Sequence, residues 1–404
     1  MKSFWSCFIL IAIGSSLSAD DWPRWQGPSG TGISTEKGWK ANLETVAWKA
    51  KLGVGFSTVS VADGKLFTMG HDGRKRGGKE TVWCLDAATG KEIWTDSYEA
   101  AIVDYLHEGG PCATPTVDGS TVYTISKDGR LNAYQAKTGK ILWTRNMMQA
   151  AGMKRPPEWG FAGSPYVLDD LLIIEAAHTF ALDKKTGKEV WRSKQYRHAY
   201  GSPIAFPHGG KTFVATLKTD GLVVLDAKDG STVAFEKWET SYRTNSTTPI
   251  VRGDKIFIST GYRRGCALFQ LKSGSLKKIY ENKKMSNHMN NSILVGDFLY
   301  GFDGNVHMAG PKELVCIRFS TGEEQWRDKS NLQVGSLIVA DNQIIALGQK
   351  GELAIAPVSA KGFSATAREQ VIGGRCWTSP VLANGRLYLR NAKGDLVCLD
   401  LRGS

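Results

Sequence analysis

A motif of the form Leu-Asp-Ala-x-Thr-Gly-Lys-x-x-Trp recurs along the chain and constrains the fold more than any other feature. The clearest copies end at Trp94, Trp143 and Trp191, each shortly after a Thr-Gly-Lys triplet. A seventh copy, near residues 356–362, is barely recognisable. Weaker copies carry the following residues in the last position: Phe235, Tyr280 and Trp326. The chain is therefore predicted to be a repeat protein.

The repeat period is roughly 40 residues without helical spacing inside it, which is typical of four-stranded propeller blades. In the second repeat we expect strands at residues 113–117, 122–126, 131–135 and 141–144. Tight turns such as Asp118-Gly119 separate them, because small residues supply the positive φ that hairpins need. These aspartates could be misread as calcium ligands, but each lies between two short apolar runs and is better explained as turn chemistry.

Counting the third strand of each repeat gives eight, and the last of them, at residues 396–400, has no strand after it. Residues 45–50, with Trp48 in the expected place, read as an isolated fourth strand. A propeller left open would expose the backbone edge of its last sheet. We therefore predict an all-β fold, an eight-bladed β-propeller of four-stranded antiparallel blades. An N-terminal strand completes the last blade and closes the ring.

The N-terminus carries one basic residue, a short apolar run and then small residues up to Ala19. This pattern predicts a cleaved secretory signal at residues 1–19, a leader at 20–43 and the propeller at 44–404. The apolar run is short for a membrane span, and Cys7 lies inside it rather than at its end, which disfavours a lipid anchor. We expect a secreted or periplasmic protein.

Six cysteines remain after the expected cleavage. Cys84, Cys316 and Cys398 occupy one strand position in different repeats, so we interpret them as structural thiols. Pairing of Cys112 with Cys376 stays open, though it is not favoured. The formal net charge is +12. Because the lysines are spread among turns, a solvated surface is favoured over nucleic-acid binding.

In a propeller of this kind the first strand of each blade lines the channel. The connections between blades and the loops between second and third strands therefore share one face, and six of the seven histidines lie on it. Tryptophans there could stack on a flat ring, and arginines could hold carboxylates, although side chains at a channel mouth can also simply face water. The ligand-binding candidates on this face are His107, Glu108, Trp159, His198, Tyr200, Arg243, Asn245, His288, Asn290, Arg375 and Trp377.

No sequence spacing typical of a metal site is present, although separate blades could bring His107, His198 and His288 together. A nucleophile elbow and a phosphate loop are also missing from the sequence. The catalytic residues are therefore unknown, with Asp303 as a weak candidate.

The repeat motif and the opening Trp22-Pro23-Arg24-Trp25-Gln26-Gly27-Pro28 resemble the secreted PQQ-like β-propeller repeat proteins of bacteria. This resemblance implies two kinds of relative. Quinoprotein dehydrogenases hold pyrroloquinoline quinone and calcium, whereas BamB-like lipoproteins act as scaffolds in outer-membrane protein assembly. The chain departs from both. It has no adjacent Cys-Cys pair and no lipobox, and its nearest candidates for a calcium set are Glu108, Asn245 and Asp303.

We therefore expect an exported, non-catalytic binding or scaffold module that takes an unknown protein or small-molecule ligand at the channel mouth. The alternative is a pyrroloquinoline-quinone-dependent oxidoreductase, alcohol dehydrogenase-like. Arg243 and Arg375 would then hold quinone carboxylates, and Asp303 would be the general base. A third hypothesis is a polysaccharide binder with Trp159, Trp377 and Tyr200 as sugar platforms.

Overall fold

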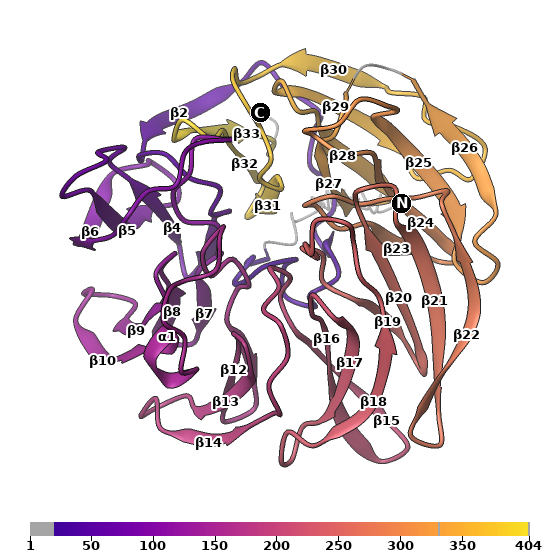
Figure 1. The fold of residues 1–404 in the computed structure, drawn as a ribbon. Helices are drawn as coiled ribbons and strands as arrows, with labels where there is room; N and C mark the ends of the chain where they lie inside the picture. Colours follow the sequence, from indigo (N-terminus) through magenta and orange to yellow (C-terminus); the bar gives the residue numbers. More distant parts are fainter. Residues whose placement is uncertain (1–19, 330–331, 403–404) are drawn as a thin grey trace, which may run out of the picture.

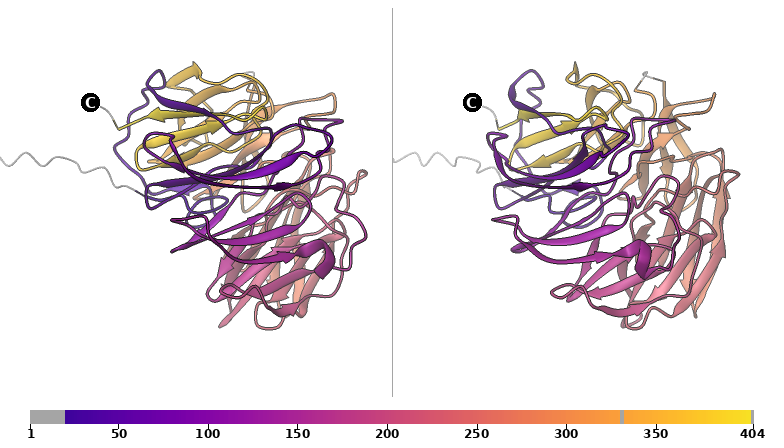
Figure 2. Two further views of the ribbon diagram at one scale, coloured as in Figure 1. Left: turned by 90° about the vertical axis from the view of Figure 1, so that its left-hand side faces the viewer. Right: turned by 60° about the vertical axis from the view of Figure 1, so that its left-hand side comes forward.

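The computed structural model describes residues 20–329 and 332–402. The expected signal peptide, residues 1–19, lies outside the described residues. Within them the strands form eight sheets arranged in chain order around a central channel (Figure 1). The side views show the same succession of blades around the ring (Figure 2). The predicted eight-bladed fold is confirmed.

Each blade has four antiparallel strands, in chain order except for the N-terminal strand of blade eight, and the strand named first is nearest the channel. Blades one to four are β3 (Ser60–Ala62), β4 (Lys65–His71), β5 (Lys79–Asp86), β6 (Glu92–Glu99); β7 (Thr116–Asp118), β8 (Thr121–Ile125), β9 (Arg130–Gln135), β10 (Ile141–Asn146); β11 (Tyr166–Leu168), β12 (Leu171–Glu175), β13 (Thr179–Asp183), β14 (Glu189–Arg192); β15 (Ile204–His208), β16 (Lys211–Leu217), β17 (Gly221–Asp226), β18 (Thr232–Lys237).

Blades five to eight follow in the same way. They are β19 (Ile250–Arg252), β20 (Lys255–Thr260), β21 (Gly265–Lys272), β22 (Ser275–Asn282); β23 (Ile293–Val295), β24 (Phe298–Asp303), β25 (Glu313–Arg318), β26 (Glu324–Asp328); β27 (Ser336–Ala340), β28 (Gln343–Leu347), β29 (Glu352–Pro357), β30 (Ala367–Gln370); β31 (Val381–Ala383), β32 (Arg386–Arg390), β33 (Asp395–Asp400), β2 (Val46–Lys51). A short helix, α1 (Met147–Ala150), follows β10.

Ring closure by an N-terminal strand occurs as expected. Strand β2 pairs antiparallel with β33 and places Trp48 opposite Cys398 (Figure 1). The observed strand starts one residue later than predicted and ends one residue later. It covers the edge of β33 and gives the last blade the same four strands as the others.

The recurring tryptophan joins each blade to the next one. The Nε1–H of Trp94 in blade one donates to the carbonyl of Ala136 in blade two at 2.8 Å, and Trp191 in blade three bonds Ala227 in blade four at 2.9 Å. The indole also covers the glycine of the neighbouring Thr-Gly turn. A Cβ built on Gly139, whose φ is +72°, would lie 2.6 Å from the Trp94 ring. The sequence motif is thus a contact between blades, which explains why the tryptophan and the glycine recur together.

The equivalent cysteines are buried and lie opposite these aromatic residues. Cys84 pairs with Trp94 and Cys316 with Trp326 across neighbouring strands. Other blades place a small or branched apolar residue at this position, such as Ala133 opposite Trp143. The described residues contain free cysteines and no disulfide, Cys112 and Cys376 included.

The leader crosses the end of the channel that lies opposite the candidate face. Trp22 bridges Val61 at the end of β3, and the carbonyl of Pro23 accepts the N–H of Val117 in β7. Further along, β1 (Ile33–Ser34) adds a parallel strand to β27. Since these strands belong to blades one, two and seven, residues 20–34 span the channel from side to side, and Figure 1 shows this indigo segment inside the ring.

In the part of the chain that the structure describes, no helix is long and apolar enough to cross a membrane.

Candidate functional site

A pocket opens at the channel mouth, and the space between its walls, together with the open solvent at its entrance, amounts to about 990 Å³. Its walls come from the connections that enter the first strands of blades one to six and blade eight, joined by two loops that follow second strands. Trp25 of the leader also lines it, and its Nε1 donates to Thr248 Oγ1 at 3.1 Å. The leader therefore supplies part of the pocket, a role that the sequence analysis did not assign to it.

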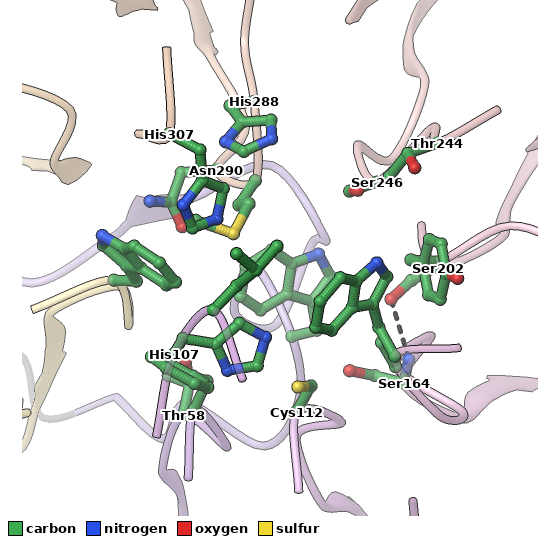
Figure 3. Close-up of a pocket in the computed structure, with 18 of the residues that line it drawn as sticks. Thr58, His107, Cys112, Ser164, Ser202, Thr244, Ser246, His288, Asn290 and His307 are labelled. Atoms are coloured by element: carbon green, nitrogen blue, oxygen red, sulfur yellow. Dashed lines mark hydrogen bonds between the residues drawn. The ribbon is translucent and has the colours of Figure 1, made fainter. Parts of the chain in front are cut away.

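Six of the eleven predicted ligand-binding residues line this pocket. The six are His107, Trp159, Tyr200, His288, Asn290 and Trp377. The close-up shows His107, His288 and Asn290 with hydroxyl side chains from other blades around the same space (Figure 3).

An aromatic belt, defined by the ring contacts that follow, runs around the mouth. The belt begins at Tyr242, and each distance below joins the centroids of two consecutive rings. Tyr242 lies 4.7 Å from Tyr262, Tyr262 lies 4.9 Å from His288, and His288 lies 5.8 Å from His307. His307 lies 5.7 Å from Trp377, and Trp377 lies 5.1 Å from Phe56. The remaining steps join Phe56 to His107 at 5.1 Å, His107 to Trp159 at 5.0 Å and Trp159 to Tyr105 at 5.0 Å. Offset and edge-to-face contacts at these spacings are favourable, so the belt is mutually supported.

The two ends of the belt are open to solvent. Tyr105 is 61% exposed and Tyr242 is 63% exposed, whereas Trp377 in the middle is 6% exposed. Both exposed tyrosines rest on a ring that lines the pocket, Trp159 and Tyr262 respectively. Exposed apolar area at a pocket mouth commonly marks an interaction site.

The histidines of the pocket are neutral near pH 7. Burial lowers the pKa of His107 to about 4, helped by the nearby positive charges of Lys127 and Arg375. Burial also lowers the pKa of His288 to about 3. The Nδ1 of His107 accepts the N–H of Gly109 at 3.0 Å, so the ring proton is on Nε2, where it can donate.

Hydroxyl groups on several blades are held in fixed positions by the neighbouring backbone. Ser164 Oγ accepts the N–H of Thr114 at 2.9 Å, and Ser202 Oγ accepts the N–H of Ser164 at 2.9 Å (Figure 3). Since a serine hydroxyl both accepts and donates, each keeps its O–H for a ligand. Asn290 donates its amide N–H to the carbonyl of Gly335 at 2.8 Å, which leaves its Oδ1 as an acceptor.

The pocket has no charged lining among the described residues: no Asp, Glu, Lys or Arg contributes to it. Cys112 lines it as a thiol, because burial raises its pKa. The polar groups that face the ligand space are therefore neutral donors and acceptors.

Arg375 lies beside the pocket without lining it. Its guanidinium stacks 4.6 Å over the Trp377 ring and pairs with Glu108 at 3.2 Å. The two predicted charged residues thus neutralise each other at the rim.

The other predicted residues do not line the pocket. Asn245 is fully buried and donates to the carbonyls of Lys218 and Trp238 at 2.7 and 3.0 Å. His198 packs edge to face with Tyr200 and with Phe161, each at 5.4 Å, and does not line the pocket. Arg243 is exposed with a φ of +55°.

Asp303 is a structural carboxylate. It pairs with Arg327 at 2.6 Å and accepts the N–H of Ser286 at 2.8 Å, and it does not line the pocket. Burial raises its pKa in spite of the arginine. This position gives it no access to a ligand in the pocket.

Pyrroloquinoline quinone and calcium do not fit these residues. The quinone carries carboxylates, yet the lining has no cation to pair with them, and Arg375 is already paired with Glu108. Calcium prefers several oxygen ligands, including carboxylates, and no group of three His, Cys, Asp or Glu side chains in the described ranges is arranged to hold a metal.

A family model described as "Outer membrane protein assembly factor BamB" matches residues 33–158 and 78–328. Among curated proteins, BamB of Moranella endobia is 22% identical over 307 residues, which cover 71% of this chain and 74% of that protein. The quinohemoprotein alcohol dehydrogenase ADH-IIG of Pseudomonas putida is 25% identical over 249 residues, covering 53% of this chain and 32% of that protein.

The first curated relatives are dehydrogenases, and the chain spans only 32% or 16% of their length. The solved structure of BamB from Moraxella catarrhalis superposes with a TM-score of 0.63 at 17% identity, covering 88% of this chain and 99% of that one. This structural likeness concerns the fold alone. Because the family model matches well over half of the residues, the chain belongs to the BamB-like family of PQQ-like β-propeller proteins.

Proposed function

We propose that this chain is an exported, non-catalytic propeller that binds a ligand in the pocket at its channel mouth. The observation that carries the proposal is the uncharged lining of that pocket, built from aromatic rings, hydroxyls and an amide. Such a lining favours binding through stacking and hydrogen bonds. Similarity to proteins named as outer membrane protein assembly factors supports a binding role.

The non-catalytic part of the proposal is supported by the position of the titratable groups. The one catalytic candidate, Asp303, is paired with Arg327 outside the pocket. The buried histidines hold a proton too weakly to act as efficient acids or bases at neutral pH, with pKa values of about 4 for His107 and about 3 for His288.

Export is supported by the sequence pattern of residues 1–19 and by the similarity to proteins named as outer membrane protein assembly factors. In this proposal the mature chain begins near Asp20 with the leader, and the propeller follows from residue 44.

A second candidate function, a quinone-dependent oxidoreductase, is favoured by the dehydrogenase relatives, one of them 25% identical over 249 residues. A thermal-melt titration with pyrroloquinoline quinone and Ca²⁺ separates the two. Binding to the folded state alone would raise stability by about 2.7 kcal/mol at a hundredfold excess over Kd. We expect no saturable shift and no alcohol oxidation with an artificial electron acceptor. A shift that disappears in Trp377→Ala, together with turnover, would establish the oxidoreductase.

A further inference from the structure

We propose that the ligand of this pocket is an uncharged sugar ring at the end or in the side branch of a longer glycan. The inference rests on the proposed function, because it names the chemical class of the ligand for the same pocket. The aromatic belt, the fixed hydroxyls and the exposed tyrosines at the rim support it.

The belt offers the surface that a sugar ring requires. One face of a pyranose carries C–H bonds that neighbouring oxygens make slightly positive, and this face is attracted to the negative face of an aromatic ring. Trp159 lies in the pocket wall, only partly buried, with Tyr105 stacked on one of its faces at an angle of 30° and His107 tilted against it at 41°. Trp159 therefore offers the sugar the part of its ring that lines the pocket, and Tyr105 offers a ring exposed to solvent beside it.

Hydroxyl and amide groups suit the edge of the same ring. Thr58, Ser164, Ser202, Thr244 and Ser246 place hydroxyls around the pocket, on connections that lead into blades one, three, four and five. A sugar has several hydroxyls, each both donor and acceptor, that point outward around its ring. Small neutral side chains spread around the wall can pair with such groups, whereas a purely apolar ligand would leave them without partners.

The missing charges limit the sugar to a neutral one. A uronic acid or sialic acid would bring a carboxylate into a space with no lining cation, and desolvating an unpaired carboxylate is costly. An amino sugar with a free ammonium group would meet no carboxylate there. Neutral hexoses, pentoses and N-acetylated sugars remain.

The exposed ends of the belt indicate that the ligand extends beyond the pocket. Tyr242 stacks on Tyr262 with ring centroids 4.7 Å apart, yet its side chain is 63% exposed. Tyr105 is exposed in the same way at the other end. These two exposed rings, each supported by a ring that lines the pocket, could carry the sugar units that follow the one in the pocket.

The test is isothermal titration calorimetry of the full mature chain with defined hexasaccharides. The neutral probes are cellohexaose, maltohexaose, xylohexaose, mannohexaose and N-acetylchitohexaose, and hexagalacturonate is the charged probe of the same length. We expect at least one neutral probe to bind saturably and hexagalacturonate not to bind.

Single substitutions test whether the probe binds in this pocket. Trp159→Ala should raise the Kd of the probe that binds by about tenfold, and Tyr105→Ala and Tyr242→Ala should each raise it by about threefold. These are the changes expected for the loss of single aromatic contacts. Phe235 is the matched control, since it is an exposed aromatic residue on the outer strand β18, away from the pocket. Phe235→Ala should bind like the unmodified protein. Thermal midpoints of all four variants verify that they are folded.

Three results would overturn the sugar assignment. They are no binding of any neutral probe at millimolar concentration, equal or tighter binding of hexagalacturonate, and binding that folded Trp159→Ala leaves unchanged. The quinone titration on the same protein keeps the two proposals apart. A quinone shift would overturn the proposed function itself, whereas failed sugar binding without such a shift rejects the sugar class alone.

Discussion

The indole Nε1–H of Trp48 donates a hydrogen bond to the carbonyl of Ala87 at 3.2 Å and so joins the N-terminal strand of blade eight to blade one. Trp94 makes the same contact with Ala136, and Trp191 with Ala227. The seam that closes the ring therefore uses the chemistry of the seams between consecutive blades. A second contact reinforces it: buried Arg390 of blade eight donates to the carbonyl of Ser57 and to Thr68 Oγ1, each at 2.6 Å.

Deleting residues 45–50 should open the ring, because it removes most of β2 and its pairing with β33. We expect a large drop in the thermal midpoint and increased binding of a dye that reports exposed apolar surface. Trp48→Ala should cost about 3–5 kcal/mol, as expected for truncating a buried Trp. Trp191→Ala is the matched comparison, because it removes the same contact between blades three and four. If Trp48→Ala leaves the free energy of unfolding unchanged, closure through this strand contributes nothing.

Gly90→Ala tests the contact between glycine and tryptophan. The residue has a φ of +70°, and an added Cβ would lie 2.5 Å from Cε3 of Trp48. Gly64 is the matched control, since its φ is +67° and an added Cβ would meet nothing within 4 Å. Gly64→Ala should cost about 1–2 kcal/mol from backbone strain alone, and Gly90→Ala distinctly more. Urea unfolding of both variants measures the difference, and equal costs would mean that the indole moves aside freely.

Glu80 should make stability depend on pH. It is fully buried between blades one and two, where its oxygens accept the N–H of Lys127 and the O–H of Tyr98, and burial raises its pKa to about 8. Folding therefore favours the protonated acid. This contribution is complete below the ordinary pKa of 4.5 and is lost as pH rises towards 8.

Glu80→Gln keeps the shape and removes the titration. We expect the free energy of unfolding of the unmodified protein, relative to this variant, to fall between pH 5 and 8 by up to about 1.4 kcal/mol per pH unit. Denaturant curves at four pH values measure this slope. Parallel pH profiles for the two proteins would contradict the raised pKa.

The neutral state of the pocket histidines can be observed directly. With ¹³C-labelled histidine, the Cε1–H signal of His107 should stay in its neutral position down to a pH near 4, since burial and two nearby cations lower its pKa to that value. Arg375→Ala removes one of those cations and should move the midpoint upward. Titration of His107 near pH 6.5 in the unmodified protein would mean that the pocket is more hydrated and can carry charge.

The sequence determined the propeller because the signals for it are local. The Asp and Thr of each Thr-Gly turn bond within four residues, as when Asp86 Oδ1 accepts the N–H and O–H of Thr89 at 2.8 and 2.7 Å. The tryptophan recurs at a fixed distance from that turn, so the blades and even the displaced strand at residues 46–51 could be counted from the chain alone.

Part of the site could be predicted from the order of strands in the repeats, since the connections into the first strands must meet at one end of the channel. The order of strands does not determine which way each side chain in a connection points. Asn245 turns into the protein to bind the carbonyls of Lys218 and Trp238, whereas Ser246, the next residue, lines the pocket. Likewise, Tyr200 lines the pocket and His198 does not.

Only the tertiary structure decided what the pocket is. Phe56 stacks on Trp377 at 5.1 Å although 321 positions separate them, and this contact exists because the ring closes. The ion pair of Arg375 with Glu108 likewise spans blade one, and it leaves the predicted carboxylate-binding arginine already paired. Such contacts depend on the closed geometry of eight blades. Burial and pairing then set the charge of each group, which is why the aromatic, uncharged character of the pocket could not be read from the repeats.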